Sequence, residues 1–239
     1  MPQKDWTCIA CGNVGEESTL PELCPRCGRL QTIVEAAPPR TTRLRRAVDV
    51  PRRPVERVHV EDVELANLLD GGFARGSHAL VYGGPGAGKS RLALRWLSQE
   101  PVLWATTEMN EELVAHTIDS VGANPEHVYI AESAMPHELE ELADECGASL
   151  IGFDSISELE DDDQEELIEF ARSWAPRAKR FVLIICQVTK DGDFLGPAHL
   201  AHDLDYRLKL SKAPNSGAFV DVEKSRFSAV GRASVSLLP

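Results

Sequence analysis

Short apolar runs alternate with amphipathic segments over most of the chain. Five runs have the length and flanking turns of buried strands, at 78–82, 101–105, 127–131, 149–154 and 180–186. Five segments repeat apolar residues at helical spacing, at 63–69, 91–97, 110–121, 137–146 and 165–174. Because strands and helices alternate, the pattern predicts an α/β fold around a central, mostly parallel sheet.

The pattern changes in the last part of the chain. Three runs there alternate polar and apolar residues, at 206–210, 218–223 and 233–238. Such alternation is typical of strands with one exposed face, so these runs predict a partly antiparallel edge that closes the sheet.

A glycine-rich segment joins the strand 78–82 to the helix 91–97. It fits the P-loop motif G-x-x-x-x-G-K-[ST] and reads Gly83, Gly84, Pro85, Gly86, Ala87, Gly88, Lys89 and Ser90. In that motif, backbone N–H groups bind the α- and β-phosphates, the lysine reaches the β- and γ-phosphates, and the serine hydroxyl binds Mg²⁺. Strand, loop and helix follow in the order that the motif requires. Arg91, directly after the motif, is also predicted to bind ATP. An ordinary glycine-rich turn is the alternative.

Polar residues follow three other predicted strands. Glu108 comes after strand 101–105, where its carboxylate can orient or deprotonate an attacking water, although a glutamate in a loop can also be a solvated charge. Asp154 ends an apolar strand, as the Mg²⁺-binding Walker B aspartate does. Gln187 follows strand 180–186. It therefore lies at the edge where ligands bind in open α/β sheets.

Four of the six cysteines form two C-x2-C pairs near the start, Cys8 with Cys11 and Cys24 with Cys27. This spacing predicts a closed, structural Zn²⁺ site with four thiolate ligands. The metal would supply the folding energy that so short a segment cannot gain from a core. Two disulfides, or four unrelated thiols, are the alternatives. The other two cysteines lie in apolar surroundings and are expected to be buried free thiols.

Charge is unevenly spread along the chain. Residues 1–57 carry ten Lys/Arg against seven Asp/Glu, whereas residues 58–239 carry fifteen against thirty-one. The proline-rich stretch 36–57 holds seven arginines. It is an extended linker candidate that contacts nucleic-acid phosphates, stays solvated, or docks on the acidic part. The acidic stretch 158–169 is a poor surface for DNA and predicts a solvated loop leading into a helix.

No stretch is long and apolar enough to span a membrane, and the polar start does not resemble a signal peptide. A cytoplasmic protein without membrane contact is therefore expected.

Together these motifs resemble the RadA (Sms) family of bacterial DNA-repair ATPases, in the RecA superfamily. The resemblance covers nearly the whole chain. It is carried by the four-cysteine finger and by segments at 31–35, 69–77, 188–192, 196–197 and 223–227. The finger together with the last three segments is specific, because other RecA-like ATPases rarely combine them.

The resemblance implies roles for matched positions. Glu108 would be the catalytic glutamate, Asp154 the Walker B aspartate and Gln187 a sensor of the nucleotide. Lys224 and Arg226 match a basic signature that, in related ring ATPases, reaches the nucleotide of the neighbouring subunit. Cations supplied in this way would neutralise charge developing on the γ-phosphate. A surface pair on a terminal strand is the alternative for these two residues.

The chain also departs from the family pattern. Met109 stands where the family has a second acidic residue, Gln187 replaces a His, Ala198 an Arg, and Ser228 the last Gly of the basic signature. The loop after the Walker B strand is short and acidic. Since the chain stops at Pro239, we expect a short form without the Lon-protease-like C-terminal domain. By these criteria the motifs of the ATPase core match the family. The DNA-binding loops and the C-terminal domain that supports the ring do not.

The expected organisation is a zinc finger at 1–35, a linker at 36–57 and a RecA-like ATPase domain at 58–239. The expected activity is hydrolysis of ATP with Mg²⁺ in a homo-oligomer, a hexameric ring or a filament, with Lys89 among the catalytic residues. It would act on single-stranded or branched DNA in repair or recombination, with a recombinase or replication protein as a candidate partner. The alternative is a nucleotide-dependent regulatory ATPase, similar to KaiC, that does not translocate on DNA.

Overall fold

The structure is a computed structural model that describes residues 4–8, 10–11, 13–17, 19–35, 46–50, 53–188, 203–214 and 217–238. The chain divides into two compact units, 1–53 and 54–239. No helix among the described residues combines the length and the apolar character needed to cross a bilayer.

The first unit is built on a small antiparallel sheet in the order β2-β1-β3. Its strands are β1 (Lys4–Cys8), β2 (Val14–Glu17) and β3 (Ile33–Glu35). Trp6 on β1 is only 2% exposed, because its ring lies on Gly15 of the neighbouring strand. A Cβ at Gly15 would come within 2.4 Å of that ring. These strands were not predicted, since three to five residues without apolar alternation carry too weak a pattern. A short 3-10 turn, Ala47–Asp49, follows in the same unit.

The second unit is an eight-stranded sheet in the order β13-β12-β11-β6-β10-β9-β7-β8. Five of its parallel strands are β6 (Ser77–Gly83), β7 (Val102–Thr106), β8 (Val128–Glu132), β9 (Leu150–Asp154) and β10 (Phe181–Cys186), of which β8 lies at one edge of the sheet. The remaining strands are β11 (Tyr206–Ala213), β12 (Gly217–Ser225) and β13 (Gly231–Ser236). β11 pairs parallel to β6 but antiparallel to β12, so the predicted α/β fold and its partly antiparallel edge are confirmed.

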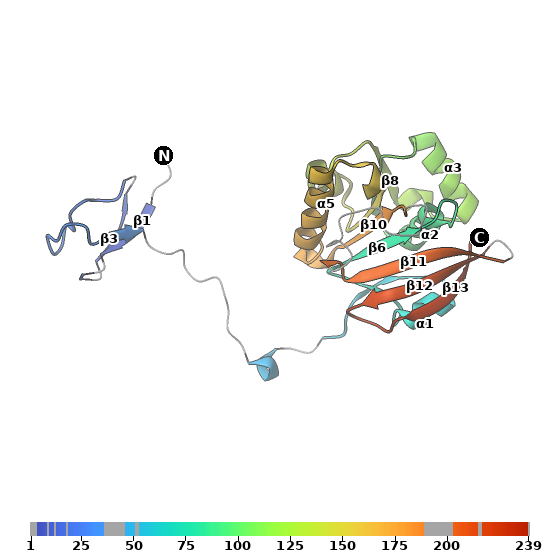
Figure 1. Cartoon of the computed structure of the whole chain (residues 1–239), viewed down its shortest axis with the longest axis horizontal. Coiled ribbons are helices and arrows are strands. Elements are labelled where there is room, and N and C mark those ends of the chain that lie inside the picture. Colours follow the sequence, from blue (N-terminus) through green and yellow to red (C-terminus); the bar gives the residue numbers. More distant parts are fainter. Residues whose placement is uncertain are drawn as a thin grey trace. The chain divides into compact units, whose positions relative to one another are not determined.

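Helices cover both faces of the inner strands (Figure 1). They are α2 (Lys89–Leu97), α3 (Glu111–Val121), α4 (Leu139–Cys146) and α5 (Asp161–Trp174). A fifth helix, α1 (Val63–Leu68), packs against β13. In β6, Ala79 and Val81 pack in the core that includes α2 and α3, whereas Leu80 and Tyr82 pack in the core that includes α4 and α5. Because both faces of β6, β7, β9 and β10 are buried, these strands are mostly apolar rather than alternating.

Helix α5 begins four residues earlier than predicted, at Asp161 instead of residue 165. Three consecutive aspartates, Asp161, Asp162 and Asp163, form its first turn. Carboxylates are favourable there because the N-terminal end of a helix carries partial positive charge. The acidic stretch is therefore partly the start of the helix and not wholly a solvated loop.

Two short strands, β4 (Arg57–His59) and β5 (Gly72–Ala74), form a separate antiparallel pair before the main sheet. Arg57, one of the arginines of the predicted linker, is bound within this unit. Its Nη1 donates to the carbonyl of Gly72 at 3.1 Å and its Nη2 to that of Phe227 at 3.0 Å. Arg57 therefore has a structural role in the second unit.

Candidate functional site

The predicted P-loop lies between β6 and α2 at the carboxyl edge of the sheet. Gly86 and Gly88 have φ angles of +68° and +92°, which a residue with a side chain rarely adopts. A Cβ at Gly83 would come within 2.3 Å of the carbonyl oxygen of Leu210 on β11, so this glycine permits the close approach of two strands. α2 begins at Lys89, directly after the loop. Its N-terminal end therefore adds partial positive charge where phosphates would lie.

Lys89 and Asp154 both line the cavity beside this loop. The ammonium of Lys89 donates to the carbonyls of Gly83 at 2.9 Å and Gly84 at 3.4 Å. Burial lowers the pKa of Lys89, while the charges of Asp154 and Glu108 oppose that change. Burial also raises the pKa of Asp154 to about 6, against the effect of its hydrogen bond with Ser90.

The carboxylate of Asp154 has the features of a Mg²⁺ ligand. It is 1% exposed, and its Oδ2 has no hydrogen-bond partner among the described residues. The Ser90 side chain is hydrogen-bonded to the same carboxylate. A hard divalent cation prefers such oxygen ligands and would favour the ionised carboxylate. Ser90 and Asp154 therefore fit the predicted Mg²⁺ site.

Glu108 lines the same cavity as Ser90 and Asp154, and hydrogen bonds hold its carboxylate in place. Its Oε1 accepts a hydrogen bond from the Ser155 hydroxyl and another, of 2.9 Å, from Nε2 of Gln187. The loop that carries Glu108 is fastened by Thr106, whose Oγ1 accepts from the backbone N–H groups of Glu108 and Met109. The carboxyl ends of β7, β9 and β10 thus bring Glu108, Asp154 and Gln187 together.

Sequence reasoning missed the residues that hold this cluster in place. Thr107 Oγ1 lies 3.2 Å from both the N and the O of Ser155, which joins the ends of β7 and β9. Ser157 Oγ accepts from the backbone N–H of Gln187 at 2.8 Å. Hydroxyl residues just after β7 and β9, at 107, 155 and 157, were the available signal. Met109, in place of a second acid, packs against the core beside α2 and α3.

One cavity of about 660 Å³ contains the predicted nucleotide site. It is lined by Pro85, Gly86, Gly88, Lys89, Ser90, Arg91, Glu108, Asp154, Gln187, Leu237 and Leu238. The two leucines follow β13 and were not expected there. Arg91 Nη2 donates to the carbonyls of Leu237 and Ser120, at 3.1 and 3.3 Å.

Lys224 and Arg226 do not line this cavity. The backbone N–H of Arg226 donates to Asp205, and that of Asp205 donates to His78 near the start of β6. Gly83 lies at the other end of the same strand, roughly 17 Å further at about 3.3 Å per residue. Within one subunit the structure therefore separates Arg226 from the P-loop. Lys224 pairs on β12 with Arg207 of β11, which is level with Leu80 in the middle of β6.

Some predicted segments lie outside the described residues. These are 189–192 and 196–197 of the family resemblance, and Ala198. Of the two cysteines expected to be buried free thiols, Cys186 is buried and Cys146 is half-buried, and neither forms a disulfide.

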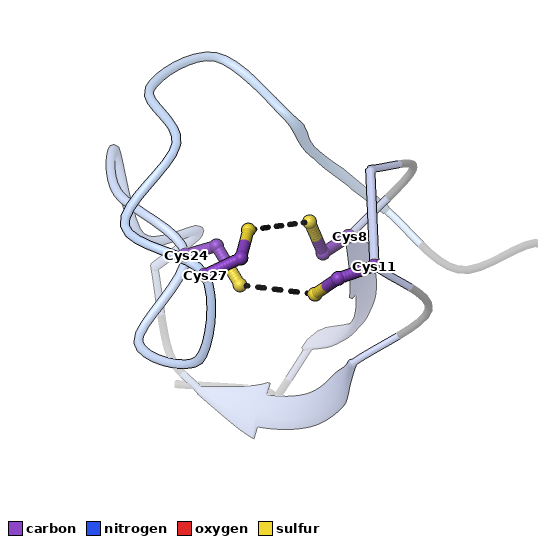
Figure 2. Close-up of side chains that lie close together, drawn as sticks. All are labelled: Cys8, Cys11, Cys24 and Cys27. Carbon is purple, nitrogen blue, oxygen red and sulfur yellow. Dashed lines mark hydrogen bonds between the residues drawn. The ribbon is translucent and has the colours of Figure 1, made fainter.

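The four cysteines of the first unit come together as the spacing predicts (Figure 2). Their sulfur atoms all lie within 4.8 Å of one another. Cys8 Sγ is 3.8 Å from Cys27 Sγ, and Cys11 Sγ is 3.7 Å from Cys24 Sγ. Four sulfurs bound tetrahedrally at about 2.3 Å from one ion would lie about 3.8 Å apart, whereas disulfide sulfurs lie about 2 Å apart. The cluster is therefore compatible with Zn²⁺.

A residue next to the cluster adjusts its chemistry. Thr32 Oγ1 lies 3.3 Å from Cys8 Sγ. This hydrogen bond lowers the pKa of Cys8 to about 6. Thiolates are the form that binds zinc, so Thr32 favours the ligating form of Cys8.

The chain is similar to several curated proteins named DNA repair protein RadA. It is 30% identical to that of Campylobacter jejuni over 83% of this chain and 50% of the relative. It is 26% identical to that of Aquifex aeolicus, over 89% of this chain and 53% of the relative. It is also 26% identical to that of Escherichia coli, over 98% and 58%. No known family profile matches the chain.

These relatives are RadA proteins, and each match covers most of this chain. The chain spans about half the length of these relatives. Its second unit has the α/β architecture of a RecA-like core. The resemblance that the motifs suggested is therefore confirmed.

Proposed function

We propose that this chain binds and hydrolyses ATP, with Mg²⁺, as a DNA-repair ATPase of the RadA family. The observation that carries the proposal is the convergence of Lys89, Asp154 and Glu108 in one cavity beside a P-loop. Hydrolysis in a P-loop enzyme requires a cation that binds phosphate, a carboxylate that binds the metal and a carboxylate that orients the attacking water.

Each of these residues has a distinct task in the proposed reaction. Lys89 binds the β- and γ-phosphates, and Ser90 and Asp154 hold the metal. Mg²⁺, when bound, neutralises charge on the β- and γ-phosphates. Glu108 orients the attacking water, and the 2.9 Å hydrogen bond from Gln187 keeps its carboxylate in place. Gln187 would sense the state of the nucleotide through that contact.

An adjacent subunit is proposed to complete the site. Lys224 and Arg226 do not line the cavity of their own subunit. Their positive charges could neutralise the negative charge that develops on the γ-phosphate of a neighbouring subunit in the transition state. This part of the proposal makes hydrolysis dependent on a homo-oligomer, either a hexameric ring or a filament.

The DNA-repair part of the proposal is supported by the names of the relatives, which are DNA repair proteins. A cytoplasmic location and action on single-stranded or branched DNA, with a recombinase or replication protein, belong to the same proposal. The zinc finger, the linker arginines other than Arg57, and the segments 188–192 and 196–197 are the parts of this chain that such contacts would use.

A second candidate function is a nucleotide-dependent regulatory ATPase that does not translocate on DNA. It is favoured by the charge of residues 58–239, which hold thirty-one Asp/Glu against fifteen Lys/Arg. A surface of this sign repels a phosphate backbone.

The Lys89→Ala variant tests ATP chemistry. We expect ATP turnover to fall about 100-fold or more, because the variant loses a cation that contacts the transferred phosphate. Turnover is measured as phosphate release. Lys209→Ala, on β11 and outside the lining of the cavity, is the matched control and should turn over at the wild-type rate. Wild-type turnover by Lys89→Ala would rule out the assigned P-loop chemistry.

Single-stranded DNA separates the two candidate functions. A DNA-repair ATPase should show ATP turnover or ATP affinity that changes severalfold when single-stranded DNA is added. If neither quantity responds to DNA at low ionic strength, where phosphate contacts are strongest, the regulatory ATPase is the better description.

A further inference from the structure

The cavity extends beyond the residues that bind phosphate and metal. Asp154, Glu108 and Gln187 follow β9, β7 and β10, which all lie on one side of β6 in the sheet. Leu237 and Leu238 follow β13, on the other side of β6. The P-loop that leaves β6 therefore has catalytic groups on one flank and an apolar wall on the other.

Leu237 is in direct contact with the P-loop. A Cβ at Gly88 would come within 2.4 Å of Leu237 Cδ2, so this side chain lies against the last glycine of the loop. Leu237 also packs against the core that includes α2. Its position beside the loop is consequently fixed by packing.

Two arginines of α2 hold the leucine segment in place. Arg91 Nη2 donates to the carbonyl of Leu237 at 3.1 Å, and Arg95 Nη1 donates to that of Leu238 at 3.2 Å. Arg95 is itself fixed by a two-pronged bond from Nη2 to the Asp62 carboxylate, at 2.7 and 2.8 Å. Ordering the segment in advance removes an entropic cost that a ligand would otherwise bear.

We propose that Leu237 and Leu238 form the wall against which the nucleoside half of the nucleotide, its base and ribose, packs. This inference rests on the proposed ATP chemistry. With the γ-phosphate between Lys89 and Asp154, the nucleotide runs along the loop toward Arg91 and leaves it on the leucine flank. An apolar wall suits the flat face of a base, and both leucine carbonyls already accept hydrogen bonds from arginines.

The test compares ATP with inorganic tripolyphosphate, which has three phosphates and no nucleoside. Affinities of the full chain for both, with Mg²⁺, are measured by calorimetry for wild type, Leu237→Ala and Leu238→Ala. We expect each substitution to lower the affinity for ATP about five- to tenfold. A loss of this size is typical when most of an apolar side chain is removed from a contact. Tripolyphosphate should bind as it does to wild type.

Leu113→Ala is the matched control. Leu113 on α3 is 49% exposed and Leu238 is 54% exposed, but only Leu238 lines the cavity. This control should bind both ligands like wild type. Leu238→Ala also guards against a packing effect, because the exposed leucine contributes little to the core.

The outcomes separate the inference from the function on which it rests. Unchanged ATP affinity in both leucine variants, or equal weakening of ATP and tripolyphosphate, would overturn the nucleoside wall while leaving the ATPase proposal standing. Failure of the wild-type chain to bind either ligand would refute the ATPase proposal and the inference together.

Discussion

Asp205 connects the start of β6 to the basic segment that follows β12. Its Oδ2 lies 2.6 Å from Nδ1 of His78, and its Oδ1 lies 3.4 Å from Nη1 of Arg226. His78 and Asp205 are buried, whereas Arg226 is largely exposed. Asp205 therefore orients a basic residue that we propose to act in a neighbouring subunit, and the motif around Arg226 gives no hint of this partner.

The pKa of Asp205 gives a prediction about stability. Burial alone would raise this pKa, but the hydrogen bond and charge of His78 hold it below the ordinary value. A carboxyl group with a lowered pKa in the folded state stabilises the fold above about pH 4, and this contribution is lost as the pH falls. We expect Asp205→Asn to lower the free energy of unfolding by about 2 kcal/mol at pH 7. Urea titrations should show the difference from wild type narrowing below about pH 4.

Asp144→Asn is the control for this measurement. Asp144 pairs with Arg180 at 2.8 Å, but its side chain is 58% exposed. Removal of such a surface pair should cost less than about 1 kcal/mol. If Asp205→Asn lowers the free energy of unfolding by the same amount at pH 3 and at pH 7, then packing, and not the charge of Asp205, is responsible.

The sequence indicated single residues of the candidate nucleotide site, but it did not indicate their partners. Glu108, Asp154 and Gln187 each follow a strand, and position alone marked them as candidates. That Gln187 and Ser155 bind the same oxygen of Glu108 depends on β7, β9 and β10 lying next to each other. Strand order is not encoded in any local pattern.

At the scale of elements, long apolar strands were predicted to within a residue or two, whereas short or polar elements were not. β10 was expected at 180–186 and spans Phe181–Cys186. The start of α5 was displaced because acidic residues suit both a solvated loop and the first turn of a helix. The strands of the finger were not predicted because they are held together by the four cysteines and Trp6, and not by a repeating apolar pattern.

The finger gives a prediction about metal removal. We expect one Zn²⁺ per chain by elemental analysis and loss of that ion in Cys24→Ser, because three thiolates bind zinc less tightly than four. Hydrogen exchange should then become fast in β1, β2 and β3 and remain slow in β6 and β10. A chelator should have the same effect on the wild-type chain.

Cys146→Ser is the matched control, since this cysteine lies at the end of α4 and outside the cluster. It should retain the metal and the slow exchange of the finger. Stoichiometric zinc in Cys24→Ser would contradict the four-cysteine site.

At the scale of the whole molecule, the position of Lys224 and Arg226 makes oligomerisation testable. If these residues act on a neighbouring nucleotide, then Lys224→Ala and Asp154→Ala subunits carry defects in different halves of a shared site. Mixed in equal amounts, they should recover roughly a quarter of wild-type ATP turnover, because some interfaces contain both intact halves. Each variant alone should remain inactive.

Light scattering and subunit exchange, followed with a fluorescent label on one variant, provide the control for mixing. Lys89→Ala mixed with Asp154→Ala should not recover, since both changes damage the same half of the site. Mixed oligomers of Lys224→Ala and Asp154→Ala that stay inactive would exclude action across the interface.

The sequence by itself determined which residues are candidates for chemistry: the phosphate-loop motif, the aspartate at the end of an apolar strand, the two cysteine pairs and the resemblance to RadA. These depend on residue types at short spacings, which the chain order preserves. Only the tertiary structure decided what surrounds them. It placed Gln187 and Ser155 on Glu108, the leucines after β13 against Gly88, and Arg226 beside Asp205 at the other end of β6. These contacts join residues far apart in the chain, and they follow from strand order and packing, which only the folded chain specifies.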